Sequence, residues 1–112
     1  MSHVIHMLLD FISKNNTNIP SNIKTLLICR ERYTKFTEQD FVAVVTTFKS
    51  SSEPKDISYV THIILDYFED KGFREFYDNR TPNIVFTLQE FETAAFVLRR
   101  LLINNCQIKA MD

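Results

Sequence analysis

The sequence predicts an all-α fold, and three observations support this prediction. The chain has 112 residues, 45% hydrophobic and 24% charged, a size and composition typical of one globular domain. Its only glycine is Gly72, whereas a small all-β domain needs glycine in many of its tight turns. Apolar residues also recur at helical spacing in several segments. We therefore expect a single domain over residues 1–112, a small helical bundle of four to six helices.

The first two helices are expected at residues 2–14 and 21–30. Both segments place apolar residues three and four positions apart, as on one face of a helix. Each also starts at a residue that can cap a helix, Ser2 in the first and Ser21 or Asn22 in the second. The end of the second segment is a continuous apolar run, so it also fits a short strand.

The third helix has the clearest start signal in the first half of the chain. In the hexapeptide FTEQDF, Thr37 can accept the backbone N–H of Asp40, and the Asp40 carboxylate can reach back to Thr37. This is a capping box with Asp in the usual Glu position. Phe36 and Phe41 flank it as a hydrophobic staple, so we expect a helix to begin here.

Two more helices are expected in the second half. Asp56 is the expected cap of the first, which should end near Gly72, where a left-handed residue is favoured. Residues 84–86 are expected to be extended. The hexapeptide FTLQEF at 86–91 then repeats the capping box and opens a last helix that runs to about Ile103.

Two pieces of the chain resemble each other. Residues 4–12 align without gaps on residues 60–68, with Val, His, Leu and Asp identical. The two capping hexapeptides follow in the same order. We interpret this as a duplication that produces a pseudo-two-fold repeat of helix–connector–helix units at about 1–50 and 56–108. Convergence of two amphipathic helices is the alternative interpretation.

The net charge of −1 is unevenly distributed along the sequence. Residues 21–35 carry four basic residues against one acidic, a charge of +3, whereas residues 51–79 carry three basic against seven acidic, a charge of −4. Such asymmetry can steer partners towards one part of a protein. It can equally reflect complementarity between two halves of the same chain.

The N-terminal apolar run is too short for a membrane span, is interrupted by Asp10, and lacks the basic start of a signal peptide. We expect an intracellular protein, cytoplasmic or nuclear, with no membrane association. Cys29 and Cys106 are then expected to be reduced, buried thiols. Frequent Asn and Ile beside scarce Ala hint at the AT-rich genome of a virus or protist.

The polar residues do not form a recognisable catalytic or metal-binding motif. His3 and His6 lie on the first helix and His62 on the matching one, too few for a zinc site without a cysteine pair. We expect His6 and His62 to make local polar pairs with Asp10 and Asp66, four positions later. Phosphate-binding loops would need glycines that the chain lacks. The prediction is therefore no enzyme, no metal or other cofactor and no small-molecule substrate.

The leading functional hypothesis is a protein–protein interaction module: an adaptor, assembly or regulatory subunit of a larger complex or homo-oligomer. Ten Phe and four Tyr exceed what a small core readily buries, and aromatic residues are enriched in interfaces. The last helix is apolar over most of its circumference, so part of it would be covered by a partner. The candidate apolar contact residues are Phe96, Leu101 and Ile103, although a central place in the core would explain them equally well.

A second candidate surface is polar. Arg30, Arg32, Tyr33 and Lys35 combine positive charge with an aromatic ring, which suits a polar contact with a protein partner. The alternative function is a nucleic-acid-binding accessory protein that uses this segment, residues 30–36, to contact phosphates and stack a base. The chain's pI of about 6.3 is lower than is typical of such proteins.

Overall fold

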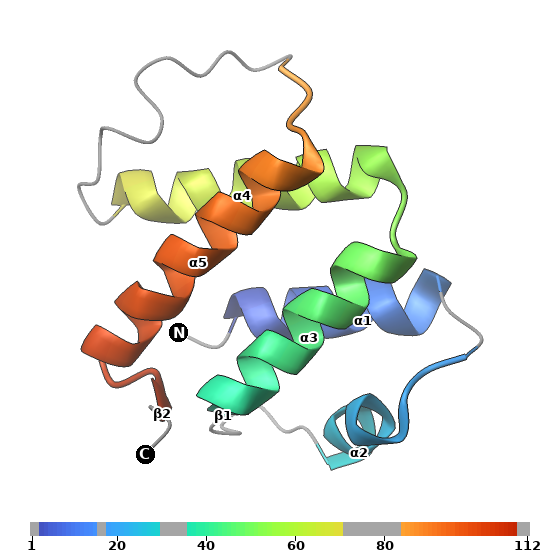
Figure 1. The fold of residues 1–112 in the computed structure, drawn as a ribbon. Coiled ribbons are helices and arrows are strands. Elements are labelled where there is room, and N and C mark those ends of the chain that lie inside the picture. Colours follow the sequence, from blue (N-terminus) through green and yellow to red (C-terminus); the bar gives the residue numbers. More distant parts are fainter. Residues whose placement is uncertain (1–2, 16–17, 30–35, 71–83, 110–112) are drawn as a thin grey trace. The chain divides into compact units, whose positions relative to one another are not determined.

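The structure is a computed structural model that describes residues 3–15, 18–29, 36–70 and 84–109 (Figure 1). Within them the chain is all-α, as predicted. Five helices account for most of the described residues, and the remaining regular structure is one pair of two-residue strands. The predicted number of four to six helices is therefore confirmed for the described part of the chain.

The chain divides into two compact units of opposite charge. One comprises Met1–Ser52 with Arg99–Asp112, and the other comprises Glu53–Leu98. The first contains nine basic and five acidic residues, a net charge of +4, and the second contains four basic and nine acidic residues, a net charge of −5. We call them the basic unit and the acidic unit. One break, at residues 52–53, falls between the predicted repeat units 1–50 and 56–108, whereas the other, at residues 98–99, falls inside the second of them. The duplication stays a prediction.

The core of the basic unit lies between α1 (His3–Asn15) and α3 (Glu38–Ser51), its most extensive helix contact (Figure 1). The rings of Phe11 and Phe48 meet edge to face, with their centroids 5.8 Å apart. Of the six apolar positions that predicted α1, Phe11 is half-buried and the other five are fully buried: Val4, Ile5, Leu8, Leu9 and Ile12. The helical spacing in the sequence therefore identified the packed face of α1 correctly.

Helix α2 (Ser21–Cys29) also belongs to the basic unit, and its start differs from the prediction. The N–H of Lys24 donates to the carbonyl of Pro20 at 2.9 Å, so Pro20 holds the N-cap position and Ser21 is the first helical residue. The predicted side-chain cap at Ser21 or Asn22 was therefore wrong. The alternative of a short strand at the end of this segment was also wrong, since the helix continues to Cys29.

Helix α3 begins at the predicted capping box. Thr37 Oγ1 accepts the N–H of Asp40 at 3.1 Å, and Asp40 Oδ2 accepts the N–H of Thr37 at 3.0 Å. The two flanking rings, Phe36 and Phe41, are both buried. The cap therefore satisfies free N–H groups at the helix end.

A two-stranded parallel ribbon in the basic unit was not predicted. Strand β1 (Phe36–Thr37) pairs with β2 (Ile108–Lys109), with Phe36 opposite Ile108. Ile108 is buried and Lys109 is exposed. Two-residue strands are too short to produce a sequence period, so only the fold reveals this pair.

The acidic unit contains α4 (Pro54–Asp70) and most of α5 (Leu88–Asn104). The N–H of Ile57 donates to the carbonyl of Glu53 at 3.1 Å, which places Glu53 at the N-cap. Asp56 was the predicted cap but lies in the first turn, because Pro54 is well suited to the first helical position. The predicted stop at Gly72 lies outside the described residues.

Helix α5 begins at the second predicted capping box, which is confirmed. Glu90 Oε1 accepts the N–H of Thr87 at 3.0 Å, and Thr87 Oγ1 accepts the N–H of Glu90 at 3.2 Å. In each unit, a histidine ring also packs against the phenylalanine that directly precedes the capping threonine. His6 lies edge-on to Phe36 in the basic unit, and His62 lies edge-on to Phe86 in the acidic unit, with centroids 5.3 and 4.6 Å apart.

The far end of α5 closes with a Schellman motif around Cys106. The N–H of Gln107 donates to the carbonyl of Leu102 at 2.8 Å, and the N–H of Cys106 donates to that of Ile103 at 3.0 Å. Cys106 takes a φ of 59° in the position that usually holds glycine. Its thiol is exposed, so the expectation of a buried thiol at this position was wrong. The side chain of Cys29 lies outside the described residues.

We expect Cys106→Gly to raise the free energy of unfolding by roughly 0.5–1 kcal/mol. The left-handed conformation costs a non-glycine residue about 1–2 kcal/mol, which exceeds the extra entropy that glycine loses on folding. Urea denaturation in reducing buffer measures the change. Cys106→Ala is the control, because it removes the thiol and keeps the backbone cost. An equal gain in both variants would contradict this explanation.

Candidate functional site

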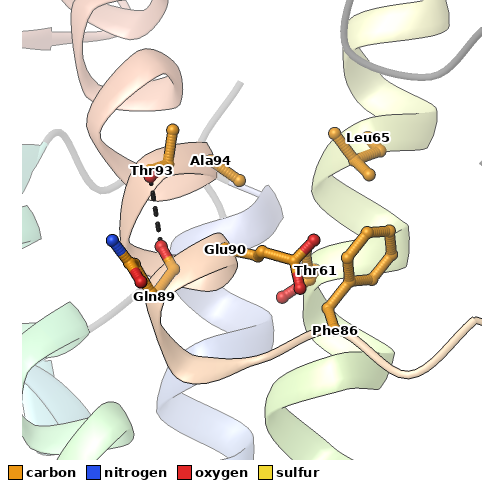
Figure 2. Close-up of a pocket in the computed structure, with 7 residues that line it drawn as sticks. All are labelled: Thr61, Leu65, Phe86, Gln89, Glu90, Thr93 and Ala94. Atoms are coloured by element: carbon orange, nitrogen blue, oxygen red, sulfur yellow. Dashed lines mark hydrogen bonds between the residues drawn. The ribbon is translucent and has the colours of Figure 1, made fainter. Parts of the chain in front are cut away.

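The acidic unit contains a pocket of about 350 Å³ between α4 and α5 (Figure 2). We call it the α4–α5 pocket. The residues that line it come from α4, from the segment that leads into α5, and from the first two turns of α5. In this order the lining residues are Thr61, Leu65, Phe86, Gln89, Glu90, Thr93 and Ala94.

Two side chains of α4 fix the segment that leads into α5. Ser58 Oγ accepts the N–H of Phe86 at 2.9 Å, in a buried hydrogen bond. His62 Nε2 lies 2.8 Å from the carbonyl oxygen of Ile84, a geometry in which the protonated ring nitrogen donates. The His62 ring also meets Phe86 edge to face. The Phe86 wall of the pocket is therefore held in place by α4 at three points.

The floor of the pocket is apolar. Leu65, Phe86 and Ala94 are all buried, and the hydroxyl of Thr61 donates within its own helix, to Ile57 at 2.7 Å. A polar ligand group would therefore lose its bonds to water here with little in return. The floor is suited to an apolar side chain.

The rim of the pocket is polar and carries an acid. Gln89, Glu90 and Thr93 are exposed, and in Figure 2 the Glu90 side chain extends from α5 towards α4. Oε1 of Glu90 is held by the N–H and the hydroxyl of Thr87. The Thr93 hydroxyl donates to the carbonyl of Gln89 at 3.1 Å (Figure 2). The rim therefore presents a carboxylate that the helix cap holds in position.

Phe96, a predicted contact residue, extends this surface along α5. Its side chain is 51% exposed, and it lies three positions after Thr93, so the two residues are neighbours on the helix surface. Leu101 is half-buried and lies about 140° around the helix from Phe96. Phe96 is therefore a neighbour of the rim residue Thr93 but does not itself line the pocket, and the helix geometry does not bring Phe96 and Leu101 to one face.

Ile103, the third predicted apolar contact, is half-buried in the basic unit. It lines a smaller hollow of about 210 Å³, together with Glu38 and Arg99. Arg99 Nε lies 3.4 Å from Glu38 Oε1, an ion pair with mostly buried side chains. This hollow is therefore partly occupied by its own charge pair and is less suited to an apolar partner.

The predicted polar contact residues Arg30, Arg32, Tyr33 and Lys35 lie outside the described residues. In the described part of the chain, no group of three or more His, Cys, Asp or Glu residues could hold a metal ion.

Burial raises the pKa of the Tyr67 phenol above its ordinary value, so this side chain of α4 is neutral at physiological pH.

Exposed apolar residues are concentrated in the acidic unit. Seven large hydrophobic residues are exposed in the described part of the chain, and five of them belong to this unit: Tyr59, Ile84, Val85, Leu88 and Phe96. Val85 and Leu88 flank the Phe86–Thr87 pair on either side. Sequence reasoning missed them because it treated this stretch only as a strand and a cap, although two apolar residues beside a capping box were visible.

Comparisons with known protein families, with curated proteins and with solved structures found no match. The described helices include none that combines the length and the apolar character needed to cross a membrane.

We expect Ser58→Ala to lower the free energy of unfolding by about 1–3 kcal/mol, because it leaves the buried N–H of Phe86 without its acceptor. Thermal and urea denaturation measure the loss. Ser50→Ala is the matched control, since the Ser50 hydroxyl bonds within its own helix and is exposed. A loss no larger than that of the control would show that the Phe86 segment does not depend on this bond.

Proposed function

We propose that the chain is a non-enzymatic protein–protein interaction module, an adaptor, assembly or regulatory subunit, that binds its partner through the acidic unit. The observation that carries this proposal is that the acidic unit combines a preformed pocket with five of the seven exposed large apolar side chains of the described residues. Interfaces obtain most of their binding energy from a few apolar or aromatic residues that fill such pockets.

The surface has the parts that a protein interface requires. The pocket floor accepts an apolar anchor, and Phe96, about one turn beyond Thr93 on α5, offers an exposed aromatic ring. Polar side chains, including the Glu90 carboxylate, border the pocket. An apolar centre within a polar rim is the usual organisation of a protein–protein contact.

The charge of the acidic unit indicates the kind of partner. With four basic residues against nine acidic ones, the unit carries −5, and complementary potentials guide association and exclude partners of like charge. We therefore expect a partner that presents an apolar side chain next to basic residues.

We expect Phe96→Asp to weaken partner capture by at least about tenfold while helicity stays near that of the unaltered chain, because Phe96 is exposed. The measurement is affinity purification from native extract, with and without nuclease, followed by mass spectrometry and circular dichroism of each variant. Val42→Asp is the control, since Val42 is also exposed but lies in the basic unit. Capture that is equal for Phe96→Asp and Val42→Asp would contradict the proposal.

Nucleic-acid binding is the second candidate function, and the net charge of +4 on the basic unit favours it. It would use the segment 30–36, with Arg30 and Arg32 on phosphates. Charge reversal at these two residues should abolish retention of RNA or DNA, and retention should fall steeply with salt. If retention of RNA or DNA changed neither with the charge reversal nor with salt, this function would be eliminated.

A further inference from the structure

We infer that the chain self-associates, and that Ile28 on α2 of one copy inserts into the α4–α5 pocket of another copy. The inference rests on the proposed function, since it uses the same surface and names its occupant. It is an interaction between the basic unit of one copy and the acidic unit of another.

Ile28 is the most exposed large hydrophobic residue in the described part of the chain, at 82%. Helix α2 buries Ile23 and half-buries Leu26 and Leu27, so its own packing uses those positions and leaves Ile28 outside. Lys24 is exposed and lies four positions before Ile28, so the two share one face of the helix. This face offers one apolar side chain next to one cation.

The α4–α5 pocket has the complementary features. Its volume of about 350 Å³ is at the small end of ligand pockets and suits an aliphatic side chain on a helix. Its floor of Leu65, Phe86 and Ala94 matches an isoleucine, and Glu90 on the rim matches Lys24. The apolar side chain supplies the contact and the charge pair supplies its orientation.

The overall charges favour the same pairing. The basic unit carries +4 and the acidic unit −5, so two copies attract each other most strongly when unlike units meet. Because every copy carries both units, two copies can exchange the contact reciprocally and close a dimer, or they can continue into a chain of copies. Both arrangements use the same Ile28-to-pocket contact.

The test is sedimentation of the full chain over a concentration series up to about 1 mM, a range that reaches weak association. We expect reversible self-association that weakens as sodium chloride rises from about 0.05 to 0.5 M. Ile28→Asp removes the apolar anchor and Thr93→Arg places a long cation at the pocket rim. Each should weaken association at least about tenfold, and Val42→Asp should associate like the unaltered chain.

Mixing the two variants makes the test specific. Ile28→Asp keeps an intact pocket and Thr93→Arg keeps an intact Ile28, so an equimolar mixture should associate although neither variant does alone. A double-mutant cycle gives an independent measurement: Lys24→Gln and Glu90→Gln, which keeps the capping box, should each weaken association, and the double variant should associate no more weakly than either single variant. Circular dichroism checks that every variant keeps its helices.

Three outcomes would overturn the inference. They are an unaltered chain that stays monomeric throughout the series, association that survives Ile28→Asp, and a variant mixture that stays monomeric. None of them alters the proposed function, because capture of another protein that is lost in Phe96→Asp would still assign the acidic unit as a binding surface. If Phe96→Asp left the capture of other proteins unchanged while self-association persisted, the surface would be limited to copies of this chain.

Discussion

The placement of a buried phenylalanine before each capping threonine is the constraint on which both units depend. Phe36 and Phe86 are buried, and each is followed by a capping box. The ring of Phe36 packs edge to face with His6 of α1, and the ring of Phe86 packs in the same way with His62 of α4. The ring fixes where the chain enters the next helix, and the cap satisfies the free N–H groups there. Position and direction of α3 and α5 are thus set within six residues.

The two units use this arrangement differently, and the difference produces the candidate site. In the basic unit the phenylalanine belongs to β1, which pairs with β2. In the acidic unit the N–H of Phe86 is bonded by Ser58 instead, and the ring becomes a wall of the α4–α5 pocket. A local motif that stabilises one unit therefore also shapes the candidate site of the other.

The sequence predicted local structure where two signals agreed, but the caps predicted from single residues, Ser21 or Asn22 for α2 and Asp56 for α4, were wrong. Helical spacing predicted the buried face of α1, and both capping boxes were predicted to the residue, because caps depend only on positions one turn apart. Non-local features could not be predicted in this way: the pairing of Phe36 with Ile108, the left-handed Cys106 and the pocket. The excess of apolar positions on α5 predicted Phe96 as a contact residue, and this stays a prediction. The separation of Phe96 from Leu101 could have been calculated from their spacing.

The central claim is that copies of this chain associate through Ile28 of one copy and the α4–α5 pocket in the acidic unit of another. Amide and methyl NMR spectra of the labelled chain, recorded on dilution from about 1 mM, test it most directly. The account predicts that concentration-dependent shifts cluster at Ile28 on α2 and at Leu65, Ala94 and Phe96 around the pocket. Shifts confined to other surfaces, with these four signals constant, would contradict it.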